Sequence, residues 1–393
     1  MGLPAPTATL FYPLAGALCL AWATPVALPT VEAPAIDLNA MKVDADGATA
    51  PTPNGGTAEL TLDPELERAA TRLLVAARPV EGAALAVDVR TGRVLAWAGT
   101  KGATGAPSLP TTTLAPAASL FKIVTTTALL EKRVSPSLEV CTAGGASEIS
   151  IDHLSKPKSG AALCGPFHEA LGRSRNAVFA QLATRYLRPA DLLGTAERLG
   201  FGQDAPFDVP VKIGTLAVPD SGLDLARAAA GFLGSRLSPV GAAEIASTIA
   251  SGGRLLRFRL VERADGYEAP RRRELLSRAM RESTAREIAR MMEVTVHSGT
   301  SREVFSDEDG HNYLGDVRVA GKTGTLQPSD DDPTTSWFVG FAPSRAPRIV
   351  VSVLLENGAT YRQKANEVGR DLLRAYFAAR GYRGVTMPAN LTH

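Results

Sequence analysis

The sequence predicts an α/β (α+β) protein with three layers, in which an antiparallel sheet is flanked by helices and interrupted by an inserted all-helical subdomain. Three observations predict this class. Two strand-like segments joined by a tight turn come early, at 83–98. Helical stretches dominate from about residue 119 to 250, and two or three strand-like segments return between 317 and 355. One sheet is therefore expected to be built from both ends of the chain.

The first 58 residues are expected to lie outside the folded domain. Residues 1–28 contain no charged side chain and are apolar from residue 9 onward. They fit either a signal peptide, cleaved after the small-x-small triplet Ala21-Trp22-Ala23, or a membrane anchor of about 20 apolar residues. Both interpretations export the protein. Residues 29–58, rich in Pro, Ala, Thr and Gly, are typical of a flexible linker, and the domain is expected at 59–393.

Local signals mark the elements of this domain in order. Asp63-Pro64-Glu65 has the pattern of an N-cap followed by a first-turn proline and acid, and a helix is predicted after it. The strands 83–89 and 93–98 flank the turn Thr91-Gly92. Late strands are predicted at 317–324, 336–341 and 349–355, and a final amphipathic helix at 365–377.

Composition limits the function classes. The chain is 45% hydrophobic and 21% charged, with a formal net charge of +2, which is ordinary for a globular protein. No run of Lys and Arg indicates nucleic-acid binding. The five histidines are scattered without ligand spacing and no CxxC pair occurs, so neither a metal nor a cofactor is predicted.

Two cysteines remain once Cys19, in the apolar leader, is set aside. In an exported protein, Cys141 and Cys164 are expected to form a structural disulfide, with two buried free thiols as the alternative. Closing a loop of this length would stabilise the fold by about 3 kcal/mol in the chain-entropy model.

The first candidate catalytic motif is Ser119-Leu120-Phe121-Lys122, at the start of a predicted helix. Residues three apart lie on the same helix face, so the Ser119 hydroxyl and the Lys122 amine can approach each other. A serine hydroxyl is a weak nucleophile unless a base takes its proton, and a lysine is such a base only if burial or a neighbouring cation lowers its pKa. Ser-x-x-Lys on its own also occurs by chance on exposed helices.

Two further motifs can complete a site. Ser174-Arg175-Asn176 precedes a helix and can present a hydroxyl and an amide, although Ser174 could simply cap that helix. Lys322-Thr323-Gly324-Thr325 follows an apolar strand and offers a cation and hydroxyl donors for a carboxylate; Gly324 would let a substrate backbone lie against the strand. The bland alternative is a polar strand end with a glycine bend.

The three motifs in this order form the signature of penicillin-binding proteins and class A β-lactamases. From about residue 60 to 377 the chain resembles the transpeptidase domain of the high-molecular-mass penicillin-binding proteins. Further segments extend the likeness: Val87-Asp88-Val89, Thr91 to Ala96, Glu169-Ala170-Leu171, Ser238-Pro239, Gly299-Thr300 and Trp337 to Phe341. The resemblance implies the β-lactamase/transpeptidase-like fold.

The resemblance also implies a mechanism. Ser119 would attack the carbonyl between two D-alanines of a peptidoglycan stem peptide, and Lys122 would take its proton. Ser174 would pass a proton to the departing D-alanine, and Asn176 would hold Lys122 and the substrate amide. The terminal carboxylate would bind at Lys322, Thr323 and Thr325, beside Gly324. Stem peptides and β-lactams are the implied ligands, with other cell-wall synthesis proteins as candidate partners, in the periplasm or at the outer face of the cytoplasmic membrane.

Other functions on the same fold stay open. A D,D-carboxypeptidase would differ only in letting water reach the acyl-enzyme. Ser119 to Ile123 is also reminiscent of class D β-lactamases, but Asn176 stands where those enzymes carry a hydrophobic residue, and no clear match to the deacylating glutamate of class A follows Ser174. A non-catalytic β-lactam or cell-wall sensor is the third alternative, because a fold does not fix a function.

Overall fold

A six-stranded antiparallel sheet organises the computed structural model, which describes residues 1–2, 33–144, 148–155, 157, 162–205, 207–327, 329, 331–359 and 362–392. Its strand order is β16-β17-β18-β4-β5-β6. The strands are β4 (Glu81–Asp88), β5 (Val94–Lys101), β6 (Thr104–Gly105), β16 (Ala320–Leu326), β17 (Thr334–Ala342) and β18 (Ile349–Asn357). Early and late strands join where β18 pairs with β4, from Ile349↔Asp88 to Glu356↔Glu81. The prediction of one sheet built from both chain ends is confirmed.

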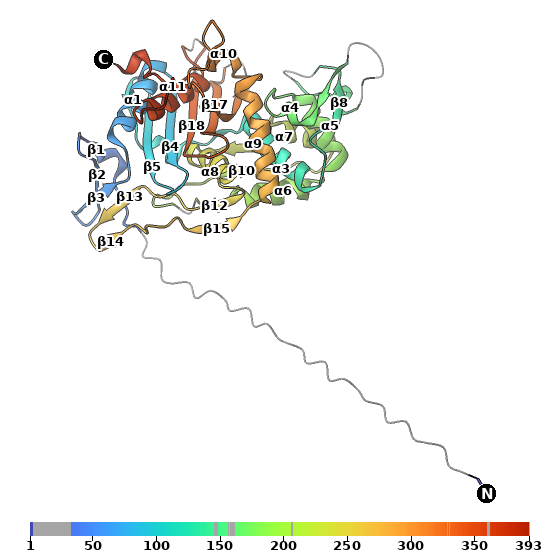
Figure 1. Cartoon of the computed structure of the whole chain (residues 1–393), viewed down its shortest axis with the longest axis horizontal. Coiled ribbons are helices and arrows are strands. Elements are labelled where there is room, and N and C mark those ends of the chain that lie inside the picture. The colour runs from blue at the N-terminus through green and yellow to red at the C-terminus, as the bar shows by residue number, and fades with distance from the viewer. Residues whose placement is uncertain are drawn as a thin grey trace. The chain divides into compact units, whose positions relative to one another are not determined.

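Helices cover both faces of this sheet. Helices α1 (Pro64–Ala77) and α11 (Ala365–Ala378) lie together on one face, and α8 (Pro239–Ala250) packs on the other against β4, β17 and β18 (Figure 1). Because β4, β17 and β18 are buried on both faces, their sequences are nearly continuous apolar runs rather than alternating ones. The predicted three-layer class is confirmed.

The predicted N-cap of α1 is formed by Asp63. Its side chain accepts the backbone N–H groups of Glu65 and Leu66, which would otherwise lack partners at the first turn. One face of α1 then buries its leucines and alanines against β4 and β5. Local capping and an apolar stripe therefore suffice to explain this helix.

A mainly helical region is inserted between β6 and β16 and is drawn from teal through green and yellow to orange in Figure 1. Its helices are α2 (Leu109–Thr112), α3 (Phe121–Glu131), α4 (Phe167–Ala170), α5 (Asn176–Tyr186), α6 (Pro189–Arg198), α7 (Gly222–Ala230), α8, α9 (Glu282–His297) and α10 (Arg302–Phe305). The insertion also carries short strands, which the expectation of an all-helical subdomain left out: β7 (Ala115–Pro116), β8 (Glu139–Thr142), β9 (Leu163–Pro166), β10 (Gly214–Leu216), β11 (Ser235–Leu237), β12 (Arg254–Leu256), β13 (Val261–Ala264), β14 (Tyr267–Glu268) and β15 (Leu275–Arg278). The described residues also form four 3-10 turns: η1 (Leu38–Ala40), η2 (Ala118–Leu120), η3 (Ile151–Leu154) and η4 (Ala389–Leu391).

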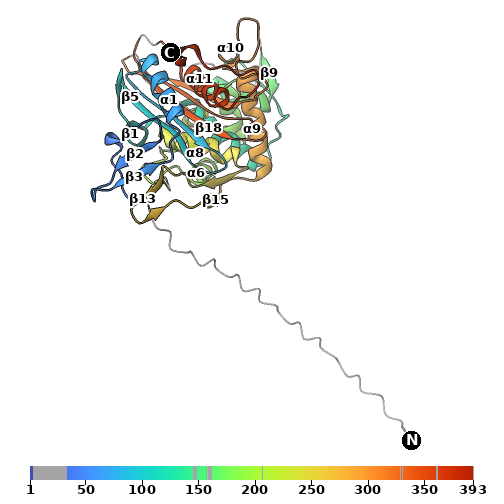
Figure 2. The ribbon, with the colours of Figure 1, turned by 60° about the vertical axis from the view of Figure 1, so that its left-hand side comes forward.

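The prediction of a flexible linker at 29–58 is wrong for most of this segment. Residues 42–60 form β1 (Lys42–Val43), β2 (Ala48–Pro51) and β3 (Thr57–Leu60), which join β13 (Val261–Ala264) and β14 (Tyr267–Glu268) in a second sheet. Both views place these strands side by side (Figures 1 and 2). Small buried side chains line these strands: Ala48, Ala50 and Ala58. Strand β3 pairs with β13, some 200 residues away in the sequence, with Leu60 opposite Val261. Neither feature produces a local hydrophobic signal.

The predicted leader at 1–28, and residues 29–32 of the predicted linker, lie almost entirely outside the described residues. Within the part of the chain that the structure describes, no helix combines the length and hydrophobicity needed to cross a membrane. Residues 33–393 form one compact unit.

Candidate active site

Ser119 lies in the turn η2, directly before helix α3. The residue before it, Ala118, has φ +47°. This left-handed backbone conformation is rare for residues other than glycine and costs about 1–3 kcal/mol. A hydrogen bond ties the segment before this turn to the sheet, because the Trp337 indole N–H of β17 donates to the Pro116 carbonyl at 2.8 Å. Apart from Glu131 at its end, α3 is buried along its length, so this helix is part of the core and fixes the turn at its beginning.

Lys122 is completely buried beneath Ser119. Its Nζ donates to Ser119 Oγ at 2.7 Å and to the Ala230 carbonyl at 2.7 Å, and it lies 5.8 Å from the centre of the Phe179 ring. Burial, with the positive charge of Lys322 as the smaller cause, lowers the pKa of Lys122 well below its usual range. A neutral amine at this distance can accept the proton of the serine hydroxyl.

Ser174 joins the same network from the turn before α5. It has φ +51°, and its Oγ donates to Ser119 Oγ at 3.0 Å. Lys322 Nζ in turn donates to Ser174 Oγ at 3.2 Å. Asn176 is the first residue of α5 and is buried. The two serine hydroxyls are therefore in contact, with one lysine on either side.

Lys322, Thr323, Gly324 and Thr325 lie along β16, the edge strand of the central sheet. Lys322 is fully buried and also donates to the Thr323 carbonyl at 2.6 Å; burial lowers its pKa to about 7. A Cβ added at Gly324 would lie 3.4 Å from that of Ala118 and 3.2 Å from that of Trp337. The strand thus runs close against the nucleophile turn, with Thr325 exposed toward solvent.

Residues 82–374 match the model of the penicillin-binding protein transpeptidase domain. The chain belongs to this family. It is therefore an enzyme of the serine acyltransferase class, and the resemblance stated from the sequence is confirmed.

Relatives of this transpeptidase family span most of the chain. Peptidoglycan D,D-transpeptidase PbpA of Mycobacterium tuberculosis is 28% identical over 376 residues, which is 84% of this chain and 74% of that protein. The protein of the same name from Mycolicibacterium smegmatis is 26% identical over 385 residues, with the same two shares.

Solved structures show the same transpeptidase fold. The crystal structure of penicillin-binding protein A from M. tuberculosis has a TM-score of 0.67 and 25% identity, covering 84% of this chain and 82% of that one. The ceftriaxone acyl-enzyme complex of that protein has a TM-score of 0.66 and 25% identity, covering 82% of this chain and 80% of that one. A D,D-transpeptidase domain from Eggerthella lenta has a TM-score of 0.68 and 22% identity, covering 88% of this chain and 92% of that one. At this identity the match shows the fold alone.

Helix α7 contributes to this transpeptidase site through its backbone, which the motifs did not predict. Its last carbonyls accept side-chain donors from α3: Ala230 O from Lys122, and Ala229 O from Thr125 Oγ1 at 2.8 Å. Gly231 ends the helix at φ +87°, and a Cβ there would lie 2.0 Å from the Ala118 carbonyl oxygen. A run of alanines ended by glycine is a C-cap signal, but it does not reveal what the freed carbonyls contact.

Thr300, between α9 and α10, is a second contributor that the motifs missed. Its Oγ1 lies 2.6 Å from Thr323 Oγ1. The signal for it was the Gly299-Thr300 pair of the family resemblance, which carried no role. The contact places a second hydroxyl beside the strand that bears Lys322.

Cys141 and Cys164 are joined by a disulfide between the paired strands β8 and β9. This hairpin leads directly into α4 and on to Ser174. It is also tied to α5, because Gln181 Nε2 donates to the Cys141 carbonyl at 3.2 Å. The cross-link therefore stabilises the segment that precedes the second motif.

Proposed function

We propose that this enzyme is a peptidoglycan D,D-transpeptidase in which Ser119 forms an acyl-enzyme with a stem peptide ending in D-Ala-D-Ala. One observation carries the assignment of residues. Four side chains form a continuous series of contacts, Lys122 Nζ to Ser119 Oγ to Ser174 Oγ to Lys322 Nζ, at 2.7, 3.0 and 3.2 Å. This arrangement supplies a nucleophile, a base and a proton path within one network of side chains.

Acylation begins when Ser119 Oγ attacks the carbonyl between the two D-alanines and its proton moves to Lys122. The reaction needs the neutral amine, which the lowered pKa of Lys122 favours. The C–O bond forms as the carbonyl oxygen becomes negatively charged. Backbone N–H groups of Ser119 and Thr325 are our candidates for stabilising that oxygen, and such donors contribute about 3 kcal/mol each.

The tetrahedral intermediate collapses when the C–N bond to the terminal D-alanine breaks. The departing amine needs a proton, and Ser174 Oγ is placed to donate it because that hydroxyl contacts both Ser119 and Lys322. Lys322 can then restore the proton of Ser174. Asn176, buried at the start of α5, is the group that we assign to the substrate amide.

The terminal carboxylate of the substrate is assigned to the β16 edge. Thr323 and Thr325 offer hydroxyl donors there, and protonated Lys322 offers a positive charge. Gly324 lets β16 run close to the Ser119 turn, since a Cβ there would lie 3.2 Å from Trp337 and 3.4 Å from Ala118. The relative named penicillin-binding protein A has been solved as acyl-enzymes with ceftriaxone, imipenem and penicillin G. We infer that β-lactams acylate Ser119 in the same way.

Release of the acyl group by an amine of a neighbouring stem completes transpeptidation. The name of the curated relatives favours this acceptor over water, and thus a transpeptidase over a carboxypeptidase or β-lactamase. We assign the reaction to the outside of the cytoplasm, where the peptidoglycan substrate lies, with residues 1–28 as a signal peptide or anchor. Periplasmic location remains part of this proposal.

The test is to incubate the whole chain with a fluorescent penicillin and follow intact mass over hours. We expect one stable adduct on the wild-type protein and none on Ser119→Ala, with unchanged circular dichroism. Addition of a D-Ala-D-Ala stem peptide and an acceptor amine should then yield a cross-linked product. An adduct that clears within seconds would indicate a β-lactamase, and a folded protein without any adduct would overturn the catalytic proposal.

A further inference from the structure

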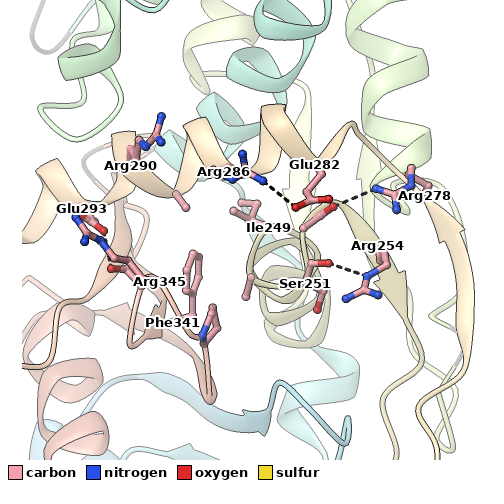
Figure 3. A pocket seen from close by; sticks show the side chains of 15 residues that line it. Ile249, Ser251, Arg254, Arg278, Glu282, Arg286, Arg290, Glu293, Phe341 and Arg345 are labelled. Carbon is pink, nitrogen blue, oxygen red and sulfur yellow. Dashed lines mark hydrogen bonds and ion pairs between the residues drawn. The ribbon is translucent and has the colours of Figure 1, made fainter.

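A basic groove follows the outer face of helix α9, away from the serine–lysine network. It consists of two adjoining cavities of about 990 and 560 Å³ that share Arg290 and Glu293 in their linings. The larger cavity lies between α9, the end of α8, the strands β12 and β15, and the turn between β17 and β18 (Figure 3). We call the two cavities together the α9 groove.

Positive charge is concentrated in the α9 groove. Its lining contains seven arginines and three carboxylates, a formal charge of +4, whereas the whole chain carries only +2. The remainder of the protein is therefore slightly negative. The arginines are Arg254, Arg278, Arg286, Arg290, Arg302, Arg318 and Arg345.

Two of the three carboxylates of the groove are already engaged, and the third, Asp316, lines the smaller cavity. Glu282 accepts from Arg286 at 2.8 Å, and Glu293 accepts from Ser344 Oγ at 2.5 Å and lies 3.7 Å from Arg318. Exposed ion pairs such as Glu282–Arg286 contribute only about 0–1 kcal/mol each, so a stronger anion can displace them.

Four arginines are available for a ligand. Among the described residues no carboxylate lies within ion-pair distance of Arg254, Arg278, Arg302 or Arg345. Arg254 and Arg278 are held in place instead, because each donates one N–H to a carbonyl at the end of α8, Ser251 O at 2.9 Å and Gly252 O at 3.2 Å. The remaining N–H groups of these two guanidinium ions make no hydrogen bond to a described residue and border the cavity (Figure 3).

We propose that the α9 groove binds a linear phosphodiester chain, the chemistry of anionic glycopolymers. The guanidinium fork matches the two free oxygens of a phosphodiester in a bidentate contact. A single phosphate is far smaller than the cavities, whereas a chain can follow α9, which is about 24 Å long at 1.5 Å per residue. A flat lipid surface cannot enter a concave site of this kind.

The test measures binding of a fluorescent glycerol phosphate oligomer, long enough to span α9, to the whole protein by anisotropy. We expect affinity to fall steeply with salt, because counterions are released when arginines contact phosphates. The variant Arg278→Glu/Arg345→Glu should weaken binding by about tenfold or more, the equivalent of losing at least one charge-assisted hydrogen bond. Arg90→Glu/Arg185→Glu is the matched control, since it changes net charge equally at exposed arginines outside the groove.

All variants should react with fluorescent penicillin at the wild-type rate, which shows that they are folded. If charge reversal impairs folding, Arg278→Gln/Arg345→Gln repeats the test with a smaller expected loss. Equal weakening by the groove and control variants would overturn the proposal, because binding would then follow net charge alone. Monomeric glycerol phosphate binding as tightly as the oligomer, or a poly-glutamate peptide of equal charge binding more tightly, would also overturn it.

Discussion

Gly231 provides a quantitative test of how α7 supports the nucleophile. A Cβ at this position would lie 2.0 Å from the Ala118 carbonyl oxygen and 3.3 Å from the backbone nitrogen of Ser119. Ordinary contacts require well over 3 Å, so Gly231→Ala must push α7 and the Ser119 turn apart by about 1 Å or more. The alanine would also have to keep φ near +87°, which costs a further ~1–2 kcal/mol.

The displacement should act on catalysis as well as on stability. Ala230 O holds Lys122 Nζ at 2.7 Å, and a shift of this contact misplaces the base relative to Ser119. A misplacement of about 1 Å can slow a reaction about 100-fold. We therefore expect the second-order rate constant for acylation by a fluorescent penicillin to fall by about that factor in Gly231→Ala.

Gly222 is a matched control at the other end of the same helix. It has φ +67°, and a Cβ there would meet nothing within 4 Å. Gly222→Ala therefore introduces the backbone strain without the clash, and should lower the free energy of unfolding by about 1 kcal/mol with acylation unchanged. If the two variants acylate at the same rate, the reasoning about Gly231 is refuted.

Three further predictions follow from the buried charges and the disulfide. Acylation should show a bell-shaped pH profile, rising as Lys122 loses its proton and falling above about pH 7 as Lys322 does. In Lys322→Arg the alkaline fall should disappear and the maximal rate should be lower, because an arginine keeps its charge but cannot return a proton to Ser174. Burial raises the pKa of Glu244 to about 8, so folding takes up a proton between about pH 4.5 and 8; stability should decline as pH rises through this range, and less so in Glu244→Gln, measured by urea unfolding. Replacing Cys141 and Cys164 by Ser should lower the free energy of unfolding by about 3 kcal/mol.

Each of these predictions has a contrary outcome. A flat acylation profile between about pH 5 and 9 would contradict the lysine pair as base and proton donor. Equal pH dependence of stability in Glu244→Gln and the wild type would show that another group causes the decline. A reducing agent should mimic the cysteine variant in the wild-type protein, and an unchanged melting temperature in both would contradict a stabilising disulfide.

Local patterns explain why much of the fold was predictable. The last helix was expected at 365–377 and is found at Ala365–Ala378, and the late strands differ from expectation by a few residues at their ends. These segments carry apolar residues at the spacing of their own secondary structure. The strands β1–β3 carry small side chains and find their partner only through a distant pairing, which a local pattern cannot reveal.

The candidate site divides in the same way. The motif residues Ser119, Lys122, Ser174 and Lys322 were predicted from residue type and order, and the structure brings their side chains together. The Ala230 carbonyl was not predictable, because every residue has a carbonyl and only tertiary packing selects this one. The sequence gives the chemical type of each side chain directly, whereas backbone contributions to a site depend on the folded geometry.

The two buried lysines also determine how the serine–lysine site exchanges protons with solvent. Because burial holds the pKa of Lys322 near 7, a fraction of molecules lacks this charge at neutral pH. An arriving carboxylate favours the charged form, so ligand capture and proton uptake become one linked event. The heat of binding an unreactive carboxylate ligand should therefore vary with the ionisation enthalpy of the buffer. Acidification of the surroundings would strengthen capture of the peptide terminus while slowing the attack that follows it.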